Sequence, residues 1–342
     1  MKVAVDLNGG DYSPIEIVRG IMIAIKSEDI SPSQILVFGD EAAIKILKSF
    51  PELKNVNYRL CSDIIGMKDK PDHSDRKKDC SLTNGICSVR DGESDVFISA
   101  GNTSAIVTLA TLILGRIKRK VSPAIAAVLP SEGGHCLLID IGANANSGPY
   151  DLLNNAKMGS AYFREILGVE NPSIGLLNIG GEIGKGHKGI NHTYDLLEKS
   201  GLNFVGYVEG NDIYIGHVDV VITDGFTGNI VLKVSEGMAK MMFDFLKAEY
   251  GNSKMFYLAL PFLICALPFL YPSFRSLQKK LDYNEYGGAL LLGVDGNIII
   301  AHGRSKKKAI AQAIHTAVRE AELNISARVL EELSNVKKIP EE

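Results

Sequence analysis

The chain has 342 residues, 46% of them hydrophobic and 23% charged, a composition that supports a substantial core and excludes extensive disorder. Its 37 Lys and Arg against 40 Asp and Glu give a net charge of −3, which lacks the positive excess that a nucleic-acid partner requires. The five cysteines are widely spaced and form no CxxC pair, which argues against a disulfide framework or a structural zinc site.

The first residues, MKVAVDLNGGD, place Asp6 where a signal peptide needs an unbroken apolar region. No stretch rich in Pro, Ser or Gly divides the chain into halves. We therefore predict a single domain over residues 1–342 and a cytoplasmic location.

Short apolar runs typical of buried strands recur along the chain, at residues 3–7, 35–39, 95–100, 136–142, 173–180, 204–209, 218–224 and 297–303. Between them lie stretches long enough for crossover helices, at residues 14–27, 41–49, 103–115, 152–167 and 229–250. This alternation predicts a doubly wound α/β fold with a mostly parallel sheet.

The loops that follow these strands are rich in glycine, and in such folds ligands bind at loops of this kind. They read DLNGGD (6–11), SAGNTSA (99–105), DIGANANSG (140–148), NIGGEIGKGHKG (178–189) and TDGFTGN (223–229). Glycine lets the backbone approach an anion closely, and a helix start offers unpaired N–H groups. Tight turns explain any one loop equally well, but five together favour a crevice for a small anion such as phosphate.

The loop at residues 223–229 carries four candidate site residues. Asp224 can fix the loop or orient a donor, and Thr227 offers a hydroxyl. Gly228 and Asn229 can present N–H and amide donors at a helix start. An ordinary capped turn is the alternative explanation.

Other loops carry candidates with the same two explanations. Asn102, Thr103 and Asn144 are equally well explained as helix-capping residues or as ligand contacts. Lys185 lies on a flexible glycine-rich loop, where it either delivers a positive charge to a phosphate or a developing oxyanion, or remains a solvated surface lysine.

A dinucleotide-binding motif is an alternative for the same loop. Gly184, Gly186 and Gly189 satisfy GxGxxG, and Glu209 follows twenty residues later. However, GGEI separates this motif from the end of the predicted strand, whereas a nicotinamide site needs the first glycine directly after it. No activated nucleophile is recognisable, so an enzyme of this sequence would have to bring two reactants together.

One segment breaks the α/β pattern. Residues 255–272, MFYLALPFLICALPFLYP, carry no charge but include Pro261 and Pro268, which disfavour a straight spanning helix. We predict an inserted apolar tip at residues 250–282 that contacts either a membrane surface or a second subunit. Nearby basic residues would suit an anionic membrane or an acidic carrier protein, namely Arg275, Lys279 and Lys280.

Read in order, these loops resemble the bacterial phosphate acyltransferases, which make acyl phosphate from fatty acyl-acyl carrier protein and inorganic phosphate for phospholipid synthesis. The likeness runs through VAVDLNGGD, SAGNTSA, DIGAN, GLLNIG, VDVVITDGFTGN, YGGALLLG and AHG. It implies a Rossmann-like three-layer α/β/α homodimer with a protruding helical hairpin, peripheral membrane contact and no cofactor.

The resemblance also implies the site. Lys185 and Asn229 would belong to the reaction centre, with Asp224 shaping it. Phosphate or acyl phosphate would contact residues of the glycine-rich loops, namely Gly101, Asn102, Thr103, Gly142, Asn144, Thr227 and Gly228. Phosphate would attack the thioester directly, which explains the missing nucleophile and metal.

The sequence departs from the family pattern next to the proposed lysine. Gly181 and Ile183 replace Thr and Asp, while His187 and Lys188 replace Asn and Glu. These changes leave open a non-catalytic, membrane-attached interaction protein as a further alternative. They also predict a substrate preference or rate that differs from those of relatives.

Overall fold

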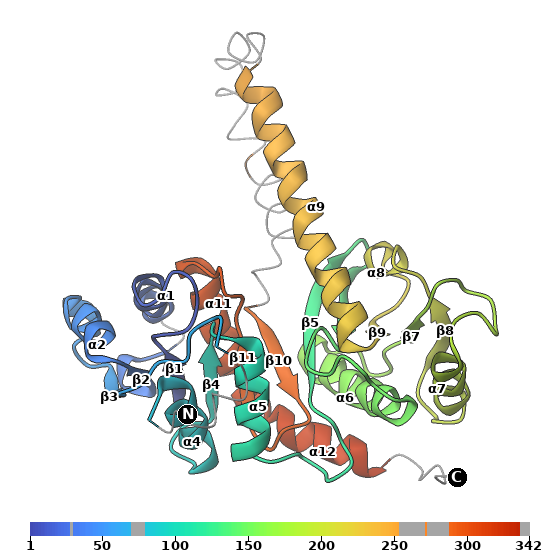
Figure 1. The fold of residues 1–342 in the computed structure, drawn as a ribbon, viewed down its shortest axis with the longest axis horizontal. Helices are drawn as coiled ribbons and strands as arrows, with labels where there is room; N and C mark the ends of the chain where they lie inside the picture. Colours follow the sequence, from blue (N-terminus) through green and yellow to red (C-terminus); the bar gives the residue numbers. More distant parts are fainter. Residues whose placement is uncertain (28–29, 70–78, 253–270, 272–286, 336–342) are drawn as a thin grey trace.

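The computed structural model describes residues 1–27, 30–69, 79–252, 271 and 287–335 (Figure 1). Eleven strands form one sheet in the order β3-β2-β1-β4-β11-β10-β5-β6-β9-β7-β8. Their bounds are β1 Val3–Asp6, β2 Ile35–Gly39, β3 Asn57–Leu60, β4 Val96–Ser99, β5 Ala124–Ser131, β6 Gly134–Ile139, β7 Ile174–Leu177, β8 Phe204–Val208, β9 Val220–Ile222, β10 Ala289–Leu292 and β11 Asn297–Ile300.

The sheet consists of two parallel groups that run in opposite directions. Strands β3, β2, β1, β4 and β11 are mutually parallel, as are β6, β9, β7 and β8. Three successive antiparallel pairs join the groups, β11 with β10, β10 with β5, and β5 with β6. The predicted α/β fold with a mostly parallel sheet is therefore confirmed, with a reversal of direction at its centre.

Helices cover both faces of this sheet. One face carries α1 Ile15–Lys26, α2 Glu41–Lys48, α6 Pro149–Leu167, α7 Lys188–Glu198, α11 Lys307–Leu323 and α12 Ile325–Asn335. The other carries α4 Ser81–Arg90, α5 Thr103–Ile113, α8 Asp212–Ile215 and the first turns of α9 Gly225–Asn252. Two short 3-10 helices complete the described elements, η1 Pro32–Gln34 and η2 Pro51–Leu53.

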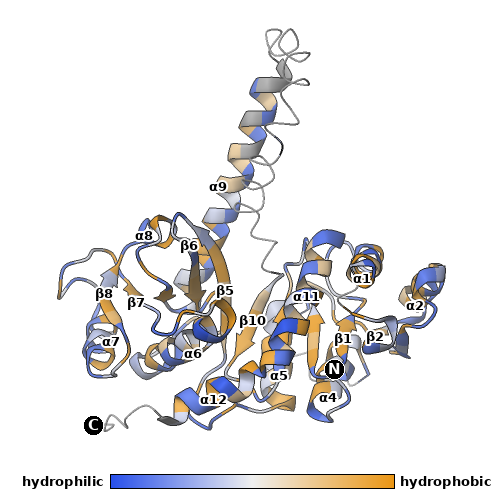
Figure 2. Cartoon of the chain, turned by 180° about the vertical axis from the view of Figure 1, so that it is seen from behind, coloured by the Kyte–Doolittle hydropathy of each residue, from blue (hydrophilic) through white to orange (hydrophobic). Residues whose placement is uncertain are grey.

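Alternating strand residues feed the two cores. Val3 and Val5 of β1 pack with the first helix layer, whereas Ala4 packs with the second. This follows from the period of two along a strand, and burial on both faces explains the nearly unbroken apolar runs of the sequence. Figure 2 shows the resulting hydrophobic strands between helices whose outward faces are hydrophilic.

Helix α9 leaves the body of the protein and projects away from it (Figure 1). The predicted tip begins at its end, but residues 253–270 and 272–286, including Arg275, Lys279 and Lys280, lie outside the described residues. In the part of the chain that is described, no helix combines the length and the apolar character needed to cross a membrane.

A buried pair links α6 to α11. The hydroxyl of Tyr162 donates to Glu320 Oε1 at 2.9 Å, and Glu320 is only 1% exposed. Burial raises the pKa of this carboxyl from 4.5 to about 8. Between pH 4.5 and about pH 8, the Glu320 carboxyl is therefore protonated in the folded protein and ionised in the unfolded chain.

This proton makes stability depend on pH. Because the folded state binds more protons, the free energy of unfolding is expected to fall on the order of 3 kcal/mol between pH 5 and pH 8 through this group. Glu320→Gln keeps the shape but cannot ionise, so urea unfolding at these two pH values should show a smaller decrease than in wild type. An equal decrease in both proteins would contradict the assignment.

Candidate active site

A cavity of about 420 Å³ lies where the two parallel groups meet. The first group contributes Gly101 and Thr103 after β4, and the segment 300–305 at the end of β11. The second contributes Ile141 and Gly142 after β6, and α9 adds Asn229. Residues 125 and 127–129 of β5, one of the two strands between the groups, also line the cavity.

A buried carboxylate fixes the glycine-rich loops of the first group. Asp6 is 2% exposed and accepts the backbone N–H of Asn8 and, at 2.7 Å, the hydroxyl of Ser99. The Ser99 oxygen in turn accepts the N–H of Gly101 at 2.9 Å. Burial raises the pKa of Asp6, and these hydrogen bonds oppose that effect.

Helix α5 begins at the cavity. Asn102 accepts the N–H of Ala105 with its side-chain oxygen, and its amide donates to the carbonyls of Met67 and Asp69. Its side chain is therefore used as a helix cap and loop anchor. Thr103 and Ser104, which follow it, line the cavity.

A second buried carboxylate organises the loop after β6. Asp140 is fully buried and accepts the backbone N–H groups of Ile125, Gly142 and Ala143 with Oδ1, each within 3.0 Å. Its Oδ2 accepts the N–H of Asn144 at 2.7 Å. Burial raises the pKa of this carboxyl, and the four donors oppose that effect.

The start of α9 packs directly on this loop. Asp224 accepts both the N–H and the hydroxyl of Thr227, at 2.9 and 2.8 Å, which caps the helix. A Cβ added to Gly228 would lie 1.9 Å from the carbonyl oxygen of Asp140, so only glycine permits this approach. The consequence is that Asn229 stands on the cavity wall beside Gly142.

Lys185 lies at the carboxyl end of the second group but not on the cavity wall as described. Its loop follows β7, which is separated from β6 by β9. The ammonium is 2.6 Å from Glu182 Oε2, and both side chains are largely exposed. Asn178 anchors the loop by donating to the carbonyls of Gly180 and Lys185.

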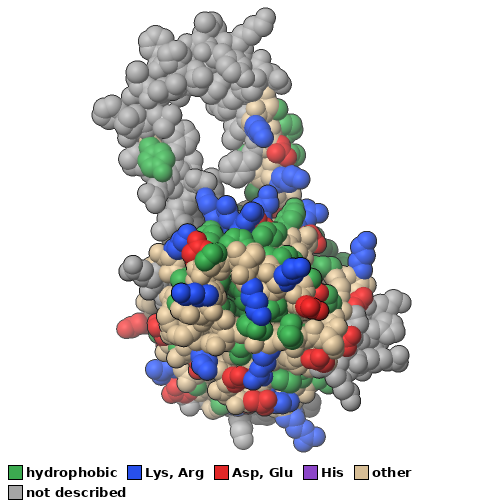
Figure 3. All heavy atoms as spheres, turned by 90° about the vertical axis from the view of Figure 1, so that its left-hand side faces the viewer, with side chains coloured by type: hydrophobic (Ala, Val, Ile, Leu, Met, Phe, Trp, Pro, Cys, Tyr) green, Lys and Arg blue, Asp and Glu red, His purple; other side chains and the backbone are tan. Residues whose placement is uncertain are grey.

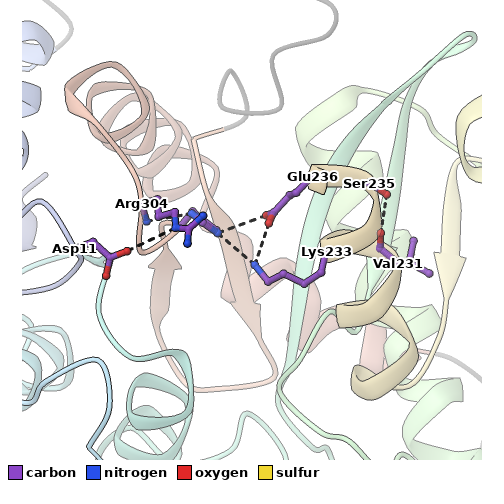
Figure 4. A network of polar contacts seen from close by, with 7 residues as sticks. Asp11, Val231, Lys233, Ser235, Glu236 and Arg304 are labelled. Carbon is purple, nitrogen blue, oxygen red and sulfur yellow. Dashed lines mark hydrogen bonds and ion pairs between the residues drawn. The ribbon is translucent and has the colours of Figure 1, made fainter. Parts of the chain in front are cut away.

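Charged residues that the sequence did not single out border the cavity. Figure 4 shows Lys233 and Glu236 of α9 reaching toward Arg304 and Asp11. His302, in the AHG motif, lies between them, 3.3 Å from Lys233 Nζ and 3.6 Å from Glu236 Oε1. The motif could have indicated His302, but Lys233 has no local signal and reaches the cavity only through the position of α9.

The structure therefore brings together some of the predicted site residues and not others. Asn229, Gly101, Thr103 and Gly142 line the cavity. Asp224 and Thr227 organise the loops behind it, as does Asp140, which the sequence did not single out. Six other candidates do not contribute to the cavity wall in the described part of the chain, namely Asn102, Asn144, Asp224, Thr227, Gly228 and Lys185.

Comparison with known proteins gives a match over nearly the whole chain. Residues 1–328 match the fatty acid synthesis protein family. A phosphate acyltransferase from Dictyoglomus turgidum is 41% identical over 340 residues, which cover 98% of each chain. One from Clostridium tetani is 41% identical over 345 residues, covering 98% of this chain and 99% of its own.

Solved structures share the fold at low identity. A phosphotransacetylase from Streptococcus pyogenes aligns with a TM-score of 0.61 at 12% identity over 94% of each chain. EutD phosphotransacetylase from Staphylococcus aureus aligns with a TM-score of 0.55 at 13% identity, again over 94% of each chain.

Proposed function

The chain belongs to the fatty acid synthesis protein family, and on that basis we propose that it takes its acyl group from a fatty acyl thioester of acyl carrier protein. It is an acyltransferase that transfers an acyl group to phosphate in phospholipid synthesis, as the resemblance implied. The observation that carries the proposal is the convergence of four of the five glycine-rich loops, all but that of Lys185, on one cavity of about 420 Å³.

The proposed reaction needs no enzyme nucleophile. An oxygen of hydrogen phosphate forms a bond to the thioester carbonyl carbon, the carbon–sulfur bond breaks, and the phosphate proton ends on the departing thiolate. A thiol has a pKa of about 8.5, so its departure needs little acid assistance. The enzyme's task is to hold both reactants and to stabilise the tetrahedral oxyanion.

Asn229 is the residue best placed for that stabilisation, because its side chain lies on the cavity wall. Lys185 would approach the reacting groups by movement of its glycine-rich loop, exchanging Glu182 for the substrate. Asp224 would position the start of α9 through Thr227 rather than contact the substrate.

The surface around α9 supports contact with the carrier protein and with a second subunit or a membrane. Four exposed basic residues lie close together in the sequence beside the cavity and would suit an acidic carrier, namely Arg304, Lys306, Lys307 and Lys308. Figure 3 shows hydrophobic side chains along the projecting α9 and basic ones near its base. Exposed residues such as Phe226, Val234, Met238 and Phe245 are more than half accessible, which fits a homodimer or peripheral membrane association.

The test is acyl phosphate formation from acyl carrier protein thioester and phosphate, trapped with hydroxylamine. Lys185→Ala is expected to lower kcat at least tenfold, because a charge near the oxyanion contributes on this scale or more. Lys199→Ala, an exposed lysine at the other end of α7, is the control and should retain the wild-type rate. No acyl phosphate from folded wild-type protein would refute the proposal, and a wild-type kcat for Lys185→Ala would remove that residue from the reaction centre.

A further inference from the structure

Three groups able to hold an anion share one side of the cavity. Lys233 comes from α9, whereas His302 and Arg304 come from the segment after β11. This segment is fixed, because the N–H of Asp11 donates to the carbonyl of Gly303 at 2.7 Å and the N–H of Ser305 to that of His302 at 2.8 Å. The groups therefore stand on a defined framework.

His302 places its imidazole between the cations of the two elements. Nδ1 accepts the backbone N–H of Arg304 at 3.1 Å. Nε2 lies 3.3 Å from Lys233 Nζ and 3.6 Å from Glu236 Oε1, and its role as donor or acceptor depends on the tautomer. Burial lowers the pKa of this imidazole, which favours the neutral form. His302 thus offers a ring nitrogen that can donate to an anion once Lys233 turns towards it.

Carboxylates hold these donors in position. Glu236 Oε2 is 3.0 Å from Lys233 Nζ, and Glu236 is the more buried of the two, with its side chain 20% exposed. Asp11 lies 3.8 Å from Arg304, and both of these side chains are largely exposed. An incoming anion has to compete with Glu236 for Lys233, but it meets little competition for Arg304.

Further donors of a different kind border the same cavity. Thr103 and Ser104 belong to the first turn of α5, whose N–H groups have no acceptor within the helix. The positive end of the helix dipole adds to the attraction for an anion. A tetrahedral anion needs donors on several sides, and a guanidinium, an ammonium and helix N–H groups together supply them.

We propose that Lys233, His302 and Arg304, together with the start of α5, form the binding site for inorganic phosphate. The inference rests on the proposed function, because it assigns the acceptor position of that same cavity. Glu236 is a competitor of the anion as well as a support for Lys233. Phosphate so bound lies in the same cavity as Asn229, where the thioester carbonyl would be attacked.

Direct binding of inorganic phosphate, measured by calorimetry without an acyl donor, tests this assignment. Arg304→Gln and Lys233→Gln are each expected to raise the Kd about tenfold or more, the effect of losing a charged hydrogen bond. Glu236→Gln is expected to lower it. Lys240→Gln, an exposed lysine on the same helix that does not line the cavity as described, should match wild type. Circular dichroism and thermal unfolding confirm that each variant is folded.

The outcomes separate this site from the wider function. The assignment of the site is overturned if Arg304→Gln and Lys233→Gln both fold and bind phosphate with wild-type affinity. It is also overturned if the wild type does not bind phosphate, even when acyl phosphate is still formed. Loss of binding in the variants supports it independently of turnover.

The carrier's prosthetic arm also contains a phosphodiester, which has the same chemistry. If the Kd for inorganic phosphate is unchanged and only the KM for acyl carrier protein thioester rises, the cations hold that arm and the proposal fails. If the variants raise the KM for phosphate even with an acyl thioester that contains no phosphate, the acceptor site is supported.

Discussion

Replacing Asn229 by alanine is expected to lower kcat about a hundredfold while leaving the fold intact, the scale found when one oxyanion donor is removed. The side chain lies on the cavity wall and is exposed, so its loss creates no buried void. It stands beside Gly142, one turn into α9.

Asn229→Asp sharpens this expectation. The carboxylate has nearly the same shape, but it cannot donate a hydrogen bond and it repels an oxyanion. Its kcat should therefore be no higher than that of Asn229→Ala. Steady-state rates of acyl phosphate formation measure both variants, with KM for each substrate determined separately.

The control for Asn229 is an asparagine that is remote from the cavity. Asn203 is exposed at the start of β8 and donates to the carbonyl of Asn171. Asn203→Ala should keep the wild-type kcat. If Asn229→Ala also keeps it, stabilisation by this amide is not part of the reaction.

Replacing Asp140 by alanine is expected to destabilise the protein on the order of 5 kcal/mol and to abolish activity. The change leaves four backbone N–H groups without their acceptor, and each buried donor left unsatisfied costs about 1–3 kcal/mol. The loop at 141–144 would also lose the contacts that place Gly142 and the start of α9.

Asp140→Asn should have a smaller effect, because the two carboxylate oxygens have different partners. An amide oxygen can replace Oδ1 and keep the donors from Ile125, Gly142 and Ala143. The NH2 group would then face the N–H of Asn144, where two donors oppose each other. The expected order of stability is wild type, Asn variant, Ala variant.

Urea unfolding measures this order, and activity measured under folding conditions follows it. Asn146→Ala is the matched control, since Asn146 is exposed in the same loop and, among the described residues, only its backbone N–H is bonded. Equal stability of the Ala variant and wild type would show that the four hydrogen bonds do not hold the loop.

The sequence predicted eight of the eleven described strands from apolar runs such as 35–39 and 136–142. It did not indicate β3, an exposed edge strand, β5, which is rich in alanine and contains Pro130, or β10, a buried run of only four residues. The omission of β5 matters most. This strand takes part in two of the three antiparallel pairs that reverse the direction of the sheet, and it lines the cavity.

Strand direction also explains which site residues could be predicted. Local spacing placed Gly101, Thr103, Gly142 and Asn229 in loops that follow strands, and these residues line the cavity. Lys185 also follows a strand, but β9 stands between its strand and β6. Spacing along the chain cannot reveal that order, because it depends on which strands pair.

The cationic side of the cavity was beyond local patterns for the same reason. Lys233 and His302 are separated by 69 positions, and only the packing of α9 against the end of β11 brings them within 3.3 Å. The membrane or dimer role of residues 250–282 remains a prediction.

The central claim is that phosphate attacks the thioester directly in this cavity. The most direct measurement is thiol release from acyl carrier protein thioester at enzyme concentrations comparable to the substrate, first without phosphate and then after its addition. Direct attack requires no thiol before phosphate is added, and thiol and acyl phosphate in equal amounts afterwards. One thiol released per site in the absence of phosphate would reveal an acyl-enzyme and contradict the claim.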